Sequence, residues 1–385
     1  MFNRKSIKKG IIAILSAVLA SLCAFGGCSG ADKETAETTV DFVVEVKKGR
    51  DPVVLQLTDT QIIDSSQRRT TDRISAGEIE YWAKDKKEDR CYKYIRDVVN
   101  RTSPDLIILT GDIIYGEFDD DGSCLTEFVA FMESFQIPWA PVFGNHDNES
   151  KMGVDWQCEQ FENAEYCLFK QRELLGNGNY SVGIKQNGKI IRAFYMLDSN
   201  GCSNYSLESL ASGHLKPSKG FGQDQIDWYN ESIKELKAKY PDVKISFAFH
   251  IQSRVFLEAL EEKYDFTGKP LDLDENGVAG DLGYVAYSFS TWEDGYVWEN
   301  MKQLGVDSIF VGHEHSISAS VVYEGIRLQF GQKSSTYDSI SYRGRMNEII
   351  ISSVDAGMPI VGGTVMYISH VDASITPFIV LCEEE

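Results

Sequence analysis

Hydrophobic and polar positions divide the chain into short apolar runs and longer amphipathic stretches. Apolar runs with the length and composition of strands buried in a sheet occupy residues 53–57, 106–109, 140–143, 245–249 and 308–311. Amphipathic stretches typical of helices occupy residues 92–99, 125–135, 157–174 and 223–239. The first half of the chain therefore alternates strand with helix.

Consecutive strands are predicted in the rest of the chain. Residues 40–46 and 53–57 are expected to form an opening hairpin, and residues 180–184 and 190–197 a second hairpin around Asn187-Gly188. Beyond residue 315 the pattern predicts strands at 317–323, 326–330, 348–352, 362–370 and 377–381. This mixture favours an α/β fold with two packed mixed β-sheets flanked by helices over a single doubly wound sheet. We expect one large domain over residues 40–385.

Residues 1–27 have the pattern of a secretory signal, because basic residues precede an uncharged apolar stretch that ends at Cys28. The sequence Phe25-Gly26-Gly27-Cys28 resembles a bacterial lipobox, in which the cysteine is lipidated and becomes the new N-terminus. Small and charged residues over 28–39 then predict a flexible tether. We expect an extracytoplasmic lipoprotein anchored to the bacterial cell membrane. A plain transmembrane anchor is the alternative, since the apolar stretch is just long enough to span a bilayer.

Composition narrows the classes of partner. With 43% hydrophobic and 11% aromatic residues the chain is typical of a globular protein with an enzyme-sized core. Its formal charge of −20 repels nucleic acid at long range and favours small substrates, or anions drawn by metals, although bound cations or a local basic groove could offset the repulsion. Beyond Cys28 the cysteines are even in number and permit up to three disulfides in an oxidising compartment; they are Cys91, Cys124, Cys158, Cys167, Cys202 and Cys382.

Polar side chains follow the apolar runs in a fixed order. They are Asp59 in Asp59-Thr60-Gln61, Asp112 after Gly111, the segment Gly144-Asn145-His146-Asp147, the lone His250, and Gly312-His313-Glu314-His315. Because the ends of neighbouring strands meet along one rim of a sheet, we expect these side chains to lie close together. Carboxylate oxygens and imidazole nitrogens suit hard cations, and a bridging carboxylate can hold two of them about 3.5 to 4 Å apart. The order therefore predicts a two-metal site.

These motifs resemble those of the calcineurin-like metallophosphoesterase superfamily, which includes the purple acid phosphatases. The resemblance runs from Asp59 to His315, and the segments at 144–147 and 312–315 are its most specific parts. It implies the αββα sandwich of that family and two divalent or mixed-valence metal ions, which would be iron, manganese or zinc. A hydroxide held by the metals would attack a phosphomonoester or a small phosphodiester.

The resemblance also assigns roles to the motif residues. Asp112 would bridge the metals, Asp59 and His315 would bind the first, and Asn145, His250 and His313 would bind the second. His146 would face the phosphate and stabilise or protonate the leaving oxygen, and Asp147 would orient its imidazole through the other ring nitrogen.

The first motif departs from the family pattern, which usually has histidine at the position of Gln61. A neutral amide is a poor ligand for a transition metal. The run from Gly111 to Tyr115 matches purple acid phosphatases, in which tyrosinate binds ferric iron. Either Tyr115 completes the ligands of the first metal, or Tyr115 packs against the sheet and Gln61 or water binds the metal.

Alternatives remain for the function as a whole. Lys333, Arg343 and Arg345 follow the last motif and are candidates for contacting substrate phosphate, although surface loops of mixed charge are the commoner explanation. A nuclease would use the same metals, but the acidic charge counts against it. A non-catalytic metal- or phosphate-binding lipoprotein would have no need of His146, so a metal-dependent phosphohydrolase is the leading hypothesis.

Overall fold

The structure is a computed structural model of the full chain, and it describes residues 39–69, 76, 79–80, 83, 87–201, 220–263, 292, 295–315, 319–335 and 361–382. Several predictions lie outside these residues. They concern the signal and tether up to residue 38, Cys28, Cys202, Arg343, Arg345 and the strand at 348–352. Among the described residues, none of the helices is long and apolar enough to cross a membrane.

A seven-stranded sheet forms one half of the fold. Its strands, in spatial order, are β1 (Phe42–Glu45), β5 (Tyr180–Gln186), β6 (Lys189–Met196), β7 (Lys244–Ala248), β8 (Val306–Val311), β10 (Ile326–Phe330) and β9 (Ser320–Tyr323). Strands β6, β7, β8 and β10 run parallel, whereas β5 and β9 are antiparallel to their neighbours β6 and β10. The ends of β7 and β8 therefore point to the same edge of the sheet.

A five-stranded sheet forms the other half. Its spatial order is β12 (Ile375–Leu381), β11 (Gly362–Ile368), β2 (Val53–Leu57), β3 (Leu106–Leu109) and β4 (Trp139–Pro141). The last three strands are parallel and fully buried, which explains their unbroken apolar runs. Both sheets are mixed, as the sequence predicts, and the α/β fold class with two packed sheets is confirmed.

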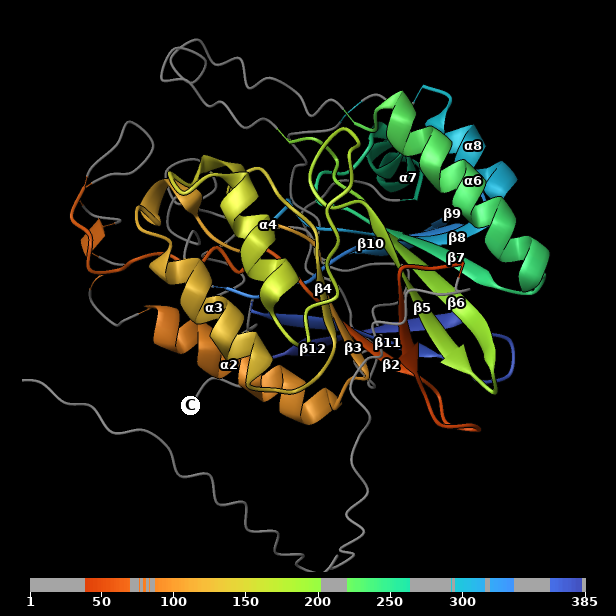
Figure 1. The fold of residues 1–385 in the computed structure, drawn as a ribbon, viewed down its shortest axis with the longest axis horizontal. Coiled ribbons are helices and arrows are strands. Elements are labelled where there is room, and N and C mark those ends of the chain that lie inside the picture. Colours follow the sequence, from red (N-terminus) through yellow and green to blue (C-terminus); the bar gives the residue numbers. More distant parts are fainter. Residues whose placement is uncertain are drawn as a thin grey trace, which may run out of the picture. The chain divides into compact units, whose positions relative to one another are not determined.

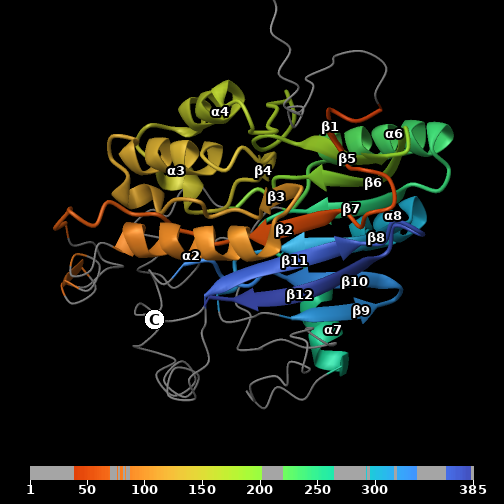
Figure 2. The ribbon, with the colours of Figure 1, turned by 90° about the horizontal axis from the view of Figure 1, so that it is seen from below.

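Helices cover the outer faces of the two sheets (Figures 1 and 2). The five-stranded sheet is accompanied by α2 (Lys87–Thr102), α3 (Ser123–Glu133) and α4 (Val154–Asn163), and the seven-stranded sheet by α6 (Gln223–Lys239), α7 (Arg254–Lys263) and α8 (Val297–Leu304). Alternate residues of β6 divide between two cores. Phe194 and Met196 join the cluster shared with the five-stranded sheet, whereas Ala193 and Tyr195 join the cluster beneath α6 and α8. Each face of this strand is therefore buried.

The predicted opening hairpin is wrong. Strand β1 pairs in parallel with β5, whereas β2 lies in the other sheet, so residues 46–52 cross between sheets. The Asp41 carboxylate helps to fix this arrangement, because it accepts hydrogen bonds from the Ser181 backbone and from the side chains of Lys170 and Arg172. The second hairpin, β5 with β6, is confirmed, with its turn at 187–188.

The helix predicted over residues 157–174 is wrong in its second half. Helix α4 ends at Asn163, and the chain then runs beside β4, where the Trp139 backbone bonds to Tyr166 and Leu168. At these residues, backbone hydrogen bonds to the edge strand β4 outweigh the local helical pattern. Helix α6 has the predicted bounds 223–239, and α3 lies two residues earlier than predicted. Helix α2 is confirmed but extends beyond the predicted 92–99 by five residues at its start and three at its end.

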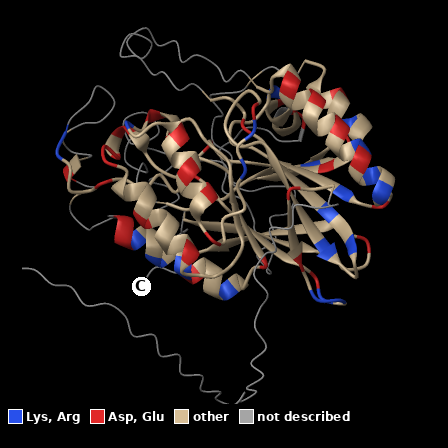
Figure 3. Ribbon diagram, viewed as in Figure 1, with Lys and Arg blue, Asp and Glu red and all other residues tan. Residues whose placement is uncertain are grey.

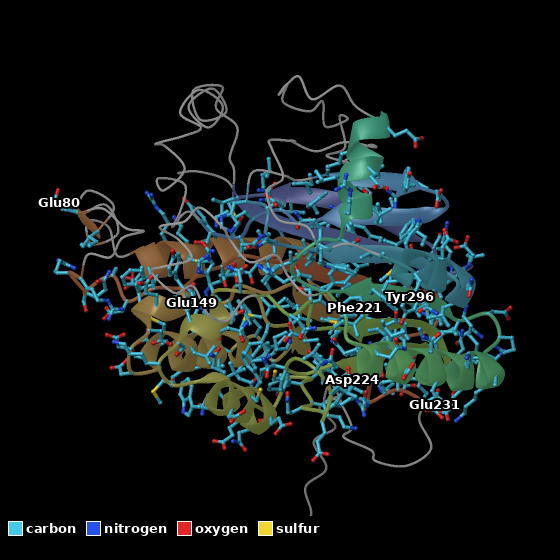
Figure 4. The ribbon with its side chains drawn as sticks, turned by 90° about the horizontal axis from the view of Figure 1, so that it is seen from above. Glu80, Glu149, Phe221, Asp224, Glu231 and Tyr296 are labelled. Atoms are coloured by element: carbon cyan, nitrogen blue, oxygen red, sulfur yellow. The ribbon has the colours of Figure 1, made fainter. Side chains whose placement is uncertain are left out.

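Acidic side chains and cysteines are both found in the described part of the chain. Acidic residues are spread along α4 and α6 (Figure 3). Asp224 and Glu231, which are labelled in Figure 4, both belong to α6. The five described cysteines are buried and form no disulfide, so three disulfides do not occur. Burial raises the pKa of the Cys91 thiol to about 12, which keeps this thiol protonated at neutral pH.

Candidate metal centre

The predicted site residues meet where strands of both sheets end. Asp59 follows β2 and Asp112 follows β3, and the loops that carry them continue the parallel pairing beyond the strands. The Asp59 backbone N–H donates to Gly111 O over 3.1 Å, and that of Gln61 donates to Asp112 O over 2.9 Å. From the other sheet, His250 follows β7, and its backbone carbonyl accepts from Gly312 N after β8.

The backbone at the site has an unusual conformation. Four residues other than glycine have left-handed φ values, namely Asp59 at 52°, Gln61 at 41°, Asp112 at 50° and His313 at 71°. Such residues persist where surrounding bonds determine the backbone, and they cluster at functional sites. Close packing adds a second constraint, because a Cβ atom at Gly144 would lie 2.2 Å from Asp112 Oδ1. The glycine of this motif is therefore required by the carboxylate beside it.

Asp112 belongs to two groups of side chains that can each hold a cation. One group is Asp112, His250 and His313, and the other is Asp59, Asp112 and His315; within each, the candidate ligand atoms all lie within 4.8 Å of one another. We call the first group, with Asn145, the His250 half, and the second group the His315 half. Since the two halves share Asp112, the site has the layout of a dinuclear centre with one bridging carboxylate.

The His250 half fits a metal ion closely. The Nδ1–H of His250 donates to Thr110 O over 2.7 Å, so Nε2 is the nitrogen that faces the site, 3.2 Å from Asp112 Oδ2, and is the one that would bind a cation. Asn145 is 2% exposed, and its Oδ1 atom has no hydrogen-bond partner among the described residues. A buried carbonyl oxygen without a partner is destabilising, and a cation would satisfy it.

The His315 half contains additional polar groups. His315 Nε2 lies 3.0 Å from Asp59 Oδ1, and the His313 backbone N–H also donates to the Asp59 carboxylate. Gln61 is completely buried here, with Nε2 at 3.4 Å from Asp112 Oδ2 and at 3.3 Å from His315 Nε2. Lys333 lies behind it, with Nζ 3.4 Å from Gln61 Oε1. This half therefore makes internal bonds with no cation bound.

Burial and the nearby carboxylates shift the pKa values of three basic side chains at the centre. Burial lowers the pKa of His250, but the charges of Asp112 and Asp59 outweigh it and raise the pKa to about 10. Burial lowers the pKa of Lys333 to about 8, although Asp59 and Asp112 oppose this shift. Burial also lowers the pKa of His315 to about 4, with the charge of Lys333 acting in the same direction. The buried carboxylates thus favour the charged form of His250, whereas burial outweighs them at Lys333 and His315.

His146 lies beside the metal ligands with its ring near the surface. Its backbone N–H donates to Asp112 Oδ1 over 2.8 Å, and its side chain is 15% exposed. The Nδ1 atom lies 2.9 Å from Glu149 Oε2, in the short turn η2 (Asp147–Glu149). Glu149 is labelled in Figure 4. The Glu149 carboxylate therefore holds the His146 ring through Nδ1.

Asp147 does not have the role that the resemblance gives it. Its carboxylate accepts from the Ile114 and Gly144 backbones at 3.0 and 2.7 Å, so it braces the loops instead of contacting the His146 ring. Burial, with the charge of Asp112, raises the pKa of Asp147 to about 7. Glu149 is the carboxylate that orients His146. The sequence offers one signal for it, since a residue three positions along lies on the same side of a helical turn.

The structure also shows the contacts of two further candidate residues, Tyr115 and Lys333. The Tyr115 ring stacks on the His146 ring with centroids 4.2 Å apart and is 8% exposed, which gives it a packing contact; binding of metal by its hydroxyl stays a prediction. Lys333 is 5% exposed and contacts Gln61 and the Asp59 backbone, so it is not a surface lysine.

Comparison with known proteins identifies the family. Residues 52–316, more than half of the chain, match the family described as calcineurin-like phosphoesterase, and the chain belongs to this family. It is 27% identical to phosphatase DCR2 of Saccharomyces cerevisiae over 244 residues, which are 60% of this chain and 39% of the yeast protein. It is 26% identical over 262 residues to probable inactive purple acid phosphatase 29 of Arabidopsis thaliana, covering 62% of this chain and 61% of the plant protein.

The chain thus spans less than two thirds of the length of either curated relative. Among solved structures it is similar to a dimetal phosphatase from Danio rerio, with a TM-score of 0.43 and 12% identity over 87% of this chain and 100% of that chain.

Proposed function

We propose that this protein is a metal-dependent phosphohydrolase that cleaves phosphomonoesters or small phosphodiesters. The observation that carries the proposal is that the two halves share the Asp112 carboxylate while the His146 ring lies beside them. Bound iron, manganese or zinc ions would neutralise charge on the phosphoryl oxygens and lower the pKa of an attacking water.

The chain's own residues supply the remaining chemistry. Asp112 positions His146, because its Oδ1 atom accepts the His146 backbone N–H while Oδ2 faces His250. Glu149 fixes the His146 ring so that Nε2 can donate a proton to the leaving oxygen. The His146 side chain is partly exposed, which is consistent with contact between this residue and a substrate. Together these contacts support a role for His146 as the acid beside the metal ligands.

A second candidate is a protein that binds metal or phosphate without turnover. Gln61 supports it, since this side chain occupies the position of a usual ligand, and some relatives are named as probable inactive enzymes. The acidic surface counts against a nuclease of the same fold.

One experiment separates these candidates. Purified protein is stripped with a chelator and reloaded with Mn²⁺, Zn²⁺ or Fe²⁺. Metal content is then measured beside turnover of aryl phosphates, alkyl phosphates, a phosphodiester and single-stranded DNA. We expect metal binding with turnover of small esters and none of DNA. Metal binding without turnover of any ester would favour the binding protein, and absence of bound metal would overturn the proposal.

We further propose that Cys28 is lipidated and anchors the mature protein outside the cytoplasmic membrane. The basic start, the apolar stretch and Gly26-Gly27-Cys28 support this. Mass spectrometry of the mature N-terminus tests it, with Cys28→Ala as the control. An intact N-terminus that remains in the membrane would instead establish a transmembrane anchor.

A further inference from the structure

Lys333 is held at the centre by the backbone around it. It follows β10, and its carbonyl oxygen accepts a hydrogen bond from Gly362 N at the start of β11. The next residue, Ser334, donates its backbone N–H to Thr58 O, directly before Asp59. The segment is thus bound on both sides, which directs the Lys333 side chain to Asp59 O and Gln61 Oε1, each at 3.4 Å.

Lys333 determines which way the Gln61 amide faces. A lysine ammonium has three donors and no acceptor, so the amide atom beside it must be the carbonyl oxygen. The amide nitrogen then faces Asp112 Oδ2 and His315 Nε2, at 3.4 and 3.3 Å. An amide nitrogen donates hydrogen bonds and offers a metal no lone pair. Gln61 is therefore turned away from binding a cation at the His315 half.

Lys333 also brings a positive charge to the same half. Its side chain is buried and lies next to the Gln61 amide, which in turn contacts two members of the His315 half. Repulsion between like charges is strong where water is excluded. The charge opposes a cation among Asp59, Asp112 and His315, and the amide takes the position of a ligand. Both effects act on one half of the centre.

The His250 half shows the opposite arrangement. Asn145 Oδ1 is buried and makes no hydrogen bond among the described residues, whereas His250 Nδ1 donates to Thr110 O and Nε2 faces Asp112 Oδ2 at 3.2 Å. These atoms are oriented as ligands, and in the described part of the chain none of them bonds to a lysine.

We infer that the centre binds metal unequally, with one cation held tightly by the His250 half and a second held weakly because the Gln61–Lys333 pair occupies the His315 half. This inference rests on the proposed metal-dependent function and assigns Lys333 as the residue that controls how many metals the protein carries.

Metal titration tests the inference without relying on activity. Full-length protein stripped of metal is titrated with Mn²⁺ alone by calorimetry, and electron paramagnetic resonance distinguishes an isolated Mn²⁺ from a coupled pair. The variants are Gln61→His, Lys333→Met and both together. Lys237→Met is the matched control, because Lys237 is a partly buried lysine that donates to Leu304 O elsewhere in the fold.

We expect wild-type protein and the Lys237→Met control to bind one equivalent tightly and the second at least about tenfold more weakly. Lys333→Met and Gln61→His should each strengthen the second equivalent, and the double variant should give the coupled-pair spectrum. Two equal tight equivalents in wild type, or weaker binding after Lys333→Met, would overturn the inference. Absence of any tight equivalent would instead overturn the proposed function. If Lys333→Met does not fold, Gln61→His with Lys333→Gln provides the same comparison.

Discussion

The two halves of the metal centre share a carboxylate but differ in what surrounds it. In the His250 half, Thr110 O holds one ring nitrogen of His250 and the other faces Asp112, while Asn145 Oδ1 makes no hydrogen bond among the described residues. In the His315 half, the same kinds of ligand are already bonded to one another and to Gln61. The difference teaches that a matching motif establishes which ligands are present, whereas the residues around those ligands determine how strongly they bind a cation.

The largest change should come from Asp112→Asn, because it removes the atom on which both halves depend. An amide at this position would lose the bridging charge and leave His250 without its carboxylate partner. We expect metal content and ester turnover to fall to background while far-ultraviolet circular dichroism is unchanged. Retained turnover would show that the halves do not share this residue.

A matched pair of variants separates the halves. His250→Ala should remove the tight cation, lowering affinity by more than the roughly 10- to 100-fold that loss of a supporting hydrogen bond costs. His315→Ala should leave the tight cation in place, because that ring is outside the His250 half. Calorimetric titration with Mn²⁺ measures both, and equal losses in the two variants would contradict the comparison.

A smaller effect is expected from Glu149→Gln, which touches neither half. Loss of the carboxylate leaves the His146 ring less well oriented, so turnover should fall by about tenfold, a fraction of what a whole acid group contributes. The loss should be greater for alkyl phosphates than for aryl phosphates, whose leaving groups need less protonation. The control is Glu159→Gln, an exposed site on α4. A loss equal for both ester classes, or accompanied by loss of metal, would count against the orienting role.

The smallest effect concerns stability. A ligand present at 100 times its Kd stabilises the native state by about 2.7 kcal/mol. Excess Mn²⁺ should therefore raise the unfolding temperature of stripped wild-type protein by a few degrees. The increase should persist in His315→Ala and disappear in His250→Ala. Differential scanning calorimetry measures the shift, and the reverse pattern would transfer tight binding to the His315 half.

Sequence patterns predict the fold class, because buried parallel strands produce distinctive apolar runs. They also predict that the motif residues cluster, because the ends of such strands meet at one edge of a sheet. They fail for the opening hairpin and for the carboxylate that orients His146. For β1 the distant strand β5 decides, and for Asp147 the backbone N–H groups of Ile114 and the nearby Gly144 take up the carboxylate. Lys333 shows the same limit, since its contact with Gln61 depends on how β10 and β11 bring residues 331–335 against Thr58.

The ligands of the centre are scattered from Asp59 to His315 and come from both sheets. Bringing such distant segments together is a late and slow event in folding, because the entropy of closing long loops must be met before the contacts form. His313 and His315 follow β8 directly, so neither half is complete until β8 has joined its sheet. A metal ion can therefore recognise the finished fold but cannot nucleate it, and metal uptake should lag behind the recovery of secondary structure during refolding.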